Sequence, residues 1–186
     1  IAVAGAVEPP VGAAAYPATS LGRGLDLASK IIRGGFGTKI FYVSQGGYDT
    51  HSGQFTGGNP GALGRHADLL DEFDQALHAF LTDMALTGYL DKVLVLSFSE
   101  FGRRVAENGS AGTDHGTGNC LFALGGRVRK GVYGGQPELD EDTVQDNKGN
   151  LAHAIDFRAV YGRVVQDWLG GDPVAVYNPG DWTLYG

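Results

Sequence analysis

Hydrophobic residues recur at three- and four-residue steps in three parts of the chain, which predicts three amphipathic helices. The first covers residues 19–32 and is capped by Thr19 or Ser20. The second and longest covers residues 63–86, and the third fits residues 156–169 with Asp156 as its cap. On the longest helix the apolar positions are Leu63, Ala67, Leu70, Phe73, Leu77, Phe80 or Leu81, and Met84, whereas Asp83 falls among the polar ones.

Short, nearly continuous apolar runs occupy residues 39–44, 92–97 and 120–124. Such runs are typical of strands that are buried on both faces, as in a parallel sheet. Helices and strands alternate along the chain, so we expect an α/β fold with a mainly parallel sheet flanked by helices.

The composition fits one domain. The chain has 186 residues, 42% of them hydrophobic, with 31 glycines and one cysteine. We expect residues 1–18 to be an N-terminal arm or linker and residues 19–186 to be a single α/β domain. Residues 135–153 are polar and predict a loop or hairpin. A single cysteine excludes an internally disulfide-stapled scaffold, and Cys120 is expected in the core.

The net charge of -7 argues against a general nucleic-acid binder, which needs clustered Lys and Arg to contact phosphates. The apolar start, residues 1–7, is too short for a membrane span and lacks the basic region of a signal peptide. Sequence motifs for nucleotide binding and for a serine-hydrolase nucleophile turn are absent. A nucleic-acid binder, a membrane span in residues 1–7, a nucleotide-binding protein and a serine hydrolase are therefore not expected.

Asp49 and His51 follow the first predicted strand, at the edge where ligands collect in open α/β sheets. In extended backbone, residues two apart project to the same side, so the carboxylate and the imidazole converge. This pair suits zinc or another divalent metal. Because Asp and His are also common in polar loops, an ordinary turn is the alternative.

Two more loops carry candidate ligands. Glu100 follows the second predicted strand, and Arg103 is placed to hold an oxyanion, with a surface Glu–Arg ion pair as the alternative. Asp114 and His115 lie between glycines, whose backbone freedom lets adjacent side chains reach one site. The three loops together predict a metal site with the ligands Asp49, His51, Glu100, Asp114 and His115. The remaining histidines, His66, His78 and His153, are expected to be structural, capping or solvated.

Three segments occur in a fixed order, GGYDTHSGQ, SFSEFGRR and AGTDHGTGN, with the longest helix between the first two. They resemble the bacterial family called domain of unknown function 1501, over about Tyr16 to Leu169. That family is similar in fold to the alkaline phosphatase and sulfatase superfamily. The resemblance implies a sheet with divalent metals at its strand ends, zinc first, with manganese, calcium or magnesium as alternatives.

In that superfamily an Asp and a His from one loop and a later His bind one metal, and Asp49, His51 and His115 match these positions. Glu100 stands where an Asp ligand of a second metal is expected. Phe101 stands where the accompanying His is expected, which is a departure from the pattern. Asp114 has no superfamily counterpart and belongs to what looks like the family's own Asp–His motif.

The resemblance also implies that related chains are longer. Their earlier half supplies another metal-binding Asp and a Ser, Thr or Cys nucleophile. This sequence therefore resembles a C-terminal, metal-binding half, a fragment whose alkaline-phosphatase-like fold is incomplete at its N-terminal side. Its expected partner is that N-terminal half or another chain.

From these features we expect a metal-dependent hydrolase of sulfate or phosphate esters that acts on a small anionic substrate. The metal would act as a Lewis acid, and Arg103 would steady the transferred group. The alternatives are a non-catalytic binding or surface-assembly protein, which Phe101 favours, and a metal-free structural domain. The resemblance suggests a periplasmic or secreted location.

Overall fold

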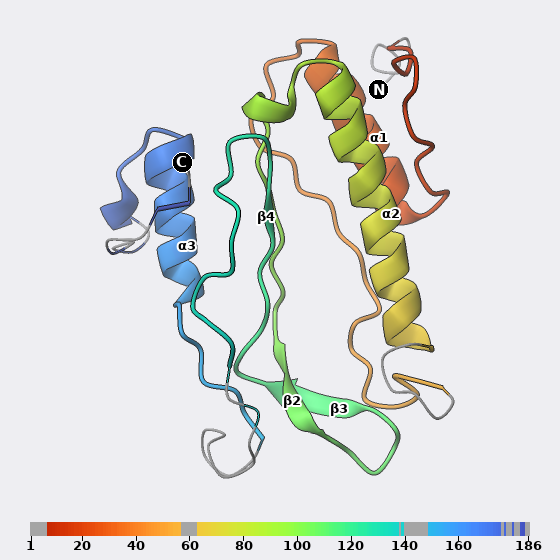
Figure 1. Cartoon of the computed structure of the whole chain (residues 1–186), viewed down its shortest axis with the longest axis vertical. Coiled ribbons are helices and arrows are strands. Elements are labelled where there is room, and N and C mark those ends of the chain that lie inside the picture. Colours follow the sequence, from red (N-terminus) through yellow and green to blue (C-terminus); the bar gives the residue numbers. More distant parts are fainter. Residues whose placement is uncertain are drawn as a thin grey trace. The chain divides into compact units, whose positions relative to one another are not determined.

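The computed structural model describes residues 7–56, 63–137, 139, 149–175, 177, 180, 183 and 184 (Figure 1). The chain divides into two compact units. The first comprises Ile1–Val93 and Asn108–Gly112, and the second comprises Leu94–Glu107 and Thr113–Gly186.

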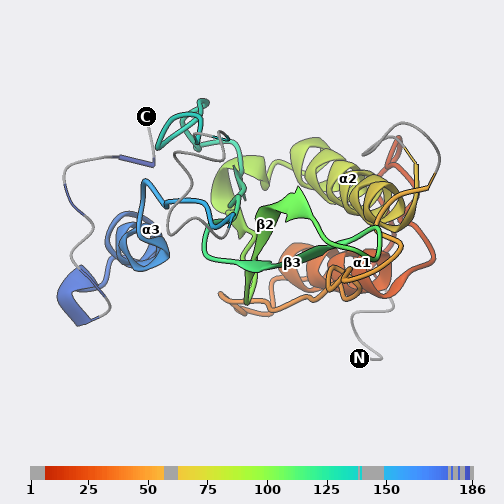
Figure 2. The same cartoon turned by 90° about the horizontal axis from the view of Figure 1, so that it is seen from below.

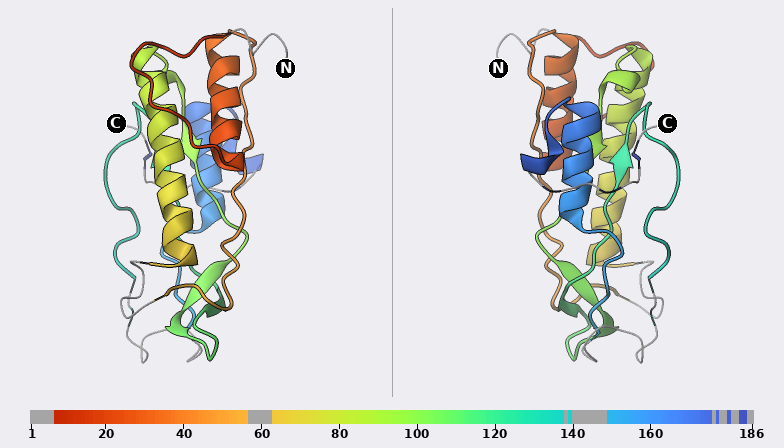
Figure 3. Two further views of the ribbon diagram at one scale, coloured as in Figure 1. Left: turned by 90° about the vertical axis from the view of Figure 1, so that its right-hand side faces the viewer. Right: turned by 90° about the vertical axis from the view of Figure 1, so that its left-hand side faces the viewer.

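Two helices dominate the first unit, as predicted. They are α1 (Ser20–Arg33) and α2 (Arg65–Leu86), which lie side by side (Figures 1 and 3). Thr19 caps α1, because its side-chain oxygen accepts a hydrogen bond of 3.1 Å from the backbone N–H of Gly22. A short 3-10 helix, η2 (Leu90–Lys92), follows α2. The buried apolar side chains of this unit are Leu21, Leu25, Ala28, Leu69, Ala76, Leu77, Ala79, Phe80 and Met84.

The buried face of α2 differs in part from the predicted one. Leu63, just before the helix, is 63% exposed and Leu70 is 42% exposed, whereas Leu69 is buried. Asp83, expected on the polar face, is only 1% exposed. Its carboxylate lies 3.3 Å from Nε of Arg33 on α1 and accepts a hydrogen bond of 3.1 Å from Tyr16. A buried charge is tolerated when it is paired in this way, and hydropathy alone does not reveal the partner.

Residues 39–44 do not form the predicted strand, and residues 37–50 have no regular secondary structure. Ile40 is 73% exposed and Tyr42 is 75% exposed. Phe41, Tyr42 and Val43 line an open cleft beside α1. An apolar run becomes a strand buried on both faces only when neighbouring strands pair with it. Among the described residues no strand pairs with this run.

The second unit contains all four described strands. β1 (Val95–Leu96) pairs with β4 (Ala123–Leu124) in antiparallel orientation. β2 (Gly102–Glu107) pairs with β3 (Thr113–Gly116), also antiparallel, as one hairpin (Figure 2).

The predicted α/β fold, with a mainly parallel sheet flanked by helices and an alkaline-phosphatase-like architecture, is therefore wrong. The described residues form two antiparallel sheets of two strands each. Periodicity shows where apolar runs lie but not which runs pair or in which direction, and tight turns favour antiparallel pairing. Cys120 is likewise exposed rather than in the core, because the strand predicted at 120–124 begins only at Ala123, as β4.

The third predicted helix is confirmed. α3 (Phe157–Arg163) begins after Asp156, whose carboxylate accepts a hydrogen bond of 2.9 Å from the backbone N–H of Arg158. It continues into a π-helical turn, η3 (Val164–Trp168), and a 3-10 turn, η4 (Pro173–Ala175), follows. Of the polar segment predicted at 135–153, residues 138 and 140–148 lie outside the described residues.

Candidate metal site

The loop that carries Asp49 and His51 alternates inward and outward side chains. Tyr48 points inward, and its hydroxyl donates to Gln45 Oε1 at 2.9 Å and lies 3.3 Å from the backbone oxygen of Leu69 on α2. Burial, with the nearby Glu72 carboxylate, raises the pKa of Tyr48. Thr50 is also buried, whereas Asp49 and His51 are exposed. Tyr48 and Thr50 anchor the loop by their side chains, and a hydrogen bond of 2.9 Å from the backbone N–H of Thr50 to the backbone oxygen of Tyr48 forms a three-residue turn at Asp49.

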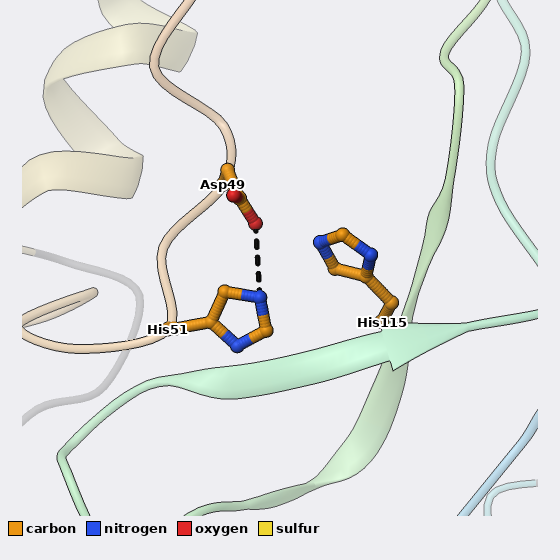
Figure 4. A group of neighbouring side chains, drawn as sticks. All are labelled: Asp49, His51 and His115. Carbon is orange, nitrogen blue, oxygen red and sulfur yellow. Dashed lines mark ion pairs between the residues drawn. The ribbon is translucent and has the colours of Figure 1, made fainter.

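Asp49 and His51 converge as predicted. Oδ1 of Asp49 lies 3.1 Å from Nε2 of His51, and the two side chains are 58% and 48% exposed (Figure 4). Two zinc ligands at tetrahedral angles, with bonds of about 2.0–2.1 Å, stand about 3.3 Å apart. The observed distance is that of an Asp–His ion pair, and it is close to the spacing of two ligands of one divalent ion.

His115 lies on β3, and Figure 4 draws its side chain. Its imidazole stacks on the ring of Phe101, with ring centroids 4.0 Å apart and an angle of 9° between the planes. Aromatic pairs of this kind contribute about 0.5–1.5 kcal/mol beyond the area that they bury. Phe101, which replaces the histidine that the resemblance led us to expect, therefore offers no donor but fixes the orientation of an imidazole.

Arg103 is directly opposite His115 in the register of the hairpin. Its Nε donates to Thr113 Oγ1 at 2.9 Å, and its Nη2 donates to the backbone oxygen of Thr113. The guanidinium carbon lies 5.6 Å from the ring centroid of Phe101. These contacts hold the guanidinium against the hairpin, and a role in binding an oxyanion remains a prediction.

Glu100 and Asp114 stay predictions as metal ligands. Glu100 is exposed just before β2, and in the described part of the chain neither residue joins a cluster of three or more His, Cys, Asp or Glu donors. Asp114 and His115 are consecutive residues of β3. Neighbouring side chains of a strand project to opposite faces, so the expected convergence of these two residues is not favoured.

The other histidines contribute no ligand pair. His78 is exposed on α2 and His153 is exposed before α3, as expected. His66 packs edge-on against Tyr48, with ring centroids 6.1 Å apart, and its backbone N–H donates to Gln54. His66, in the first turn of α2, therefore supports the loop that carries Asp49 and His51.

Sequence reasoning missed Asn108. Its side-chain amide donates a hydrogen bond of 2.9 Å to the backbone oxygen of His51. The signal was present, because Asn108-Gly109 lies between residues 102–107 and 113–116, and an Asn-Gly pair between strand-like runs predicts a hairpin turn. Recognition of that turn would have replaced the predicted loop by the β2–β3 hairpin.

Comparison with known proteins gives a family and no further relative. Residues 12–165 match the family model described as Protein of unknown function (DUF1501). No curated protein and no solved structure matches the chain significantly. None of the helices in the described ranges combines the length and hydropathy that a membrane crossing requires.

Proposed function

Because the chain belongs to the DUF1501 family of proteins of unknown function, we propose a function from the site itself: Asp49, His51 and His115 bind a divalent metal ion, zinc first. The observation that carries this proposal is the 3.1 Å separation of a carboxylate oxygen and an imidazole nitrogen on one exposed loop. One carboxylate and two imidazoles form a donor set that suits zinc and leaves a coordination position for water or substrate.

Chain connectivity supports His115 as the third donor. The turn Asn108–Gly112 belongs to the same unit as the Asp49 loop and is hydrogen-bonded to it. His115 follows Gly112 by three residues, and extended chain covers at most about 3.3–3.6 Å per residue. Three residues of chain therefore tie His115 to a turn that is hydrogen-bonded to the Asp49 loop.

We propose that this metal serves the hydrolysis of sulfate or phosphate esters, the chemistry of the sulfatase-like enzymes that the sequence motifs resemble. A bound divalent ion polarises the ester oxygen and lowers the pKa of a bound water. Arg103, opposite His115 on the hairpin, is proposed to steady the anionic group by charge-assisted hydrogen bonds.

Phe101 favours a second candidate function, that of a metal-binding protein without catalysis. Its ring stacks on His115 at the position where the resemblance led us to expect a ligand of a second metal. A site with one metal binds an anion or a partner but lacks the second charge that two-metal hydrolases use.

The proposal is tested by zinc titration of the purified chain after dialysis against metal-free buffer. Asp49→Ala, His51→Ala and His115→Ala are each expected to weaken zinc binding by more than the roughly 10–100-fold that the loss of an outer partner costs. His78→Ala, which removes an exposed histidine from α2, is the matched control and is expected to bind like the wild type. A wild type that binds no zinc, or ligand variants that bind it unchanged, overturns the metal site.

Turnover distinguishes the two functions. The zinc-loaded chain is incubated with p-nitrophenyl sulfate and p-nitrophenyl phosphate, with Arg103→Ala and His115→Ala beside it. Hydrolysis that both variants reduce supports the hydrolase. Zinc binding without hydrolysis supports the non-catalytic function.

A further inference from the structure

The turn between β2 and β3 is hydrogen-bonded to the loop that follows His51. The backbone N–H of Gly53 donates to Ser110 O at 3.2 Å, and that of Gln54 donates to Ala111 O at 2.8 Å. These two bonds run between backbone atoms, so they hold the course of the loop whatever its side chains are.

The Asn108 side chain links this turn to His51. Its Oδ1 accepts hydrogen bonds from the backbone N–H groups of Ser110 at 2.9 Å and Gly112 at 3.2 Å, and its backbone N–H donates to Gly112 O at 2.8 Å. Its Nδ2 donates to the backbone oxygen of His51 at 2.9 Å. One amide therefore shapes the turn with its oxygen and positions His51 with its nitrogen.

Gly112 makes the close approach possible. A β-carbon at this position would lie 2.4 Å from the carbonyl carbon of His51 and 2.5 Å from the backbone oxygen of Thr50. Such distances are far inside van der Waals contact, so any larger residue would push the turn away from the loop. The turn is in direct contact with the backbone of the residue that carries the Nε2 donor.

We propose that the turn Asn108–Gly112 is a clamp that fixes the backbone of His51 for metal binding, with Asn108 as a positioning residue. The inference rests on the proposed metal site and adds a residue that offers no ligand atom itself. The same hairpin carries His115 on β3, three residues after Gly112. The clamp thus orders the chain around two of the three proposed ligands, as outer partners do in other metal sites.

Two substitutions distinguish the role of the Asn108 side chain in shaping the turn from its role in holding the backbone of His51. Asn108→Ser keeps a side-chain oxygen for the N–H groups of the turn but lacks the amide nitrogen that reaches His51. Asn108→Ala removes both. Gln75→Ala is the matched control, because Gln75 is an exposed amide on α2 whose Nε2 donates to Asp71 Oδ2 at 2.7 Å.

The test measures zinc affinity by calorimetry and ligand geometry from the visible absorption of the cobalt(II) form, using the whole chain. Asn108→Ser and Asn108→Ala are expected to bind zinc about 10–100-fold more weakly and to shift the cobalt bands, and Gln75→Ala to match the wild type. Wild-type affinity and an unchanged cobalt spectrum in Asn108→Ser overturn the clamp while the metal site stands. A wild type that binds neither ion overturns the clamp together with the proposed function.

Discussion

Asp83 illustrates at the scale of one residue how a charge enters a hydrophobic core. It is almost fully buried on α2, faces Arg33 of α1 and accepts a hydrogen bond from the Tyr16 hydroxyl. Burial, with the negative charge of Asp83 adding to it, raises the pKa of Tyr16. The Arg33–Asp83 ion pair thus joins the two helices, and the hydrogen bond from Tyr16 attaches the segment before α1 to the same carboxylate. Loss of either charge of the ion pair would leave the other charge buried and unpaired.

We predict that Asp83→Ala lowers the free energy of unfolding by about 3–5 kcal/mol, because the Arg33 guanidinium then loses its buried counter-charge. Urea denaturation followed by circular dichroism measures the change. Asp71→Ala removes an exposed carboxylate from the same helix and is expected to change stability by less than about 0.5 kcal/mol. Equal stability of the two variants would show that the Arg33–Asp83 pair does not contribute to the free energy of unfolding.

At the scale of the element, the start of α3 depends on one ionised carboxylate. Hydrogen bonds from the side chain and backbone of Arg158 lower the pKa of Asp156 from 3.8 to about 2. The ionised cap also interacts favourably with the positive end of the helix dipole. The folded state therefore binds a proton on Asp156 less readily than the unfolded chain does.

A pKa lowered on folding stabilises the folded state above the ordinary value, and this contribution is lost as the pH falls. For Asp156 we predict the loss between pH 3.8 and about pH 2. Carbon-detected NMR of the Asp156 carboxyl, followed through this range, measures the pKa directly. Asp156→Asn keeps a neutral cap and should remove this part of the acid sensitivity of α3. A titration midpoint near 3.8 would contradict the prediction.

The elements could be predicted better than their pairing. Both long helices and the cap at Asp156 follow from local periodicity and capping chemistry, which act within a few residues. Residues 39–44 have the composition of a strand, yet strand formation depends on a partner elsewhere in the chain. The convergence of Asp49 and His51 could likewise be predicted from their spacing, whereas the anchoring of their loop by Asn108 depends on a residue far along the sequence.

At the scale of the whole molecule, the proposed metal binding would be linked to folding. An ion that binds only the folded state stabilises it by mass action. Asp49 and His51 lie on a loop without regular secondary structure, which is held by Tyr48, Thr50 and the turn at Asn108. A metal would add bonds where the backbone has few of its own.

We predict that zinc at about 100 times its dissociation constant stabilises the chain by about 2.7 kcal/mol, which raises Tm by roughly 5–10 °C. Differential scanning calorimetry with and without EDTA measures the shift. The double variant Asp49→Ala/His51→Ala is expected to show no shift, and His78→Ala the full shift. A shift of equal size in the double variant would indicate binding elsewhere in the chain.

Three helices, the side-chain caps of the first and third, the convergence of Asp49 with His51 and membership of a family could all be predicted from the sequence. All of these depend on residues that are neighbours along the chain or on patterns read directly from it. The tertiary structure decided the antiparallel pairing of the strands, the burial of Asp83, the stacking of His115 on Phe101 and the contact of Asn108 with His51. Each of these joins groups whose proximity is set by chain folding, because hydrogen bonds, ion pairs and ring contacts act only over a few ångströms.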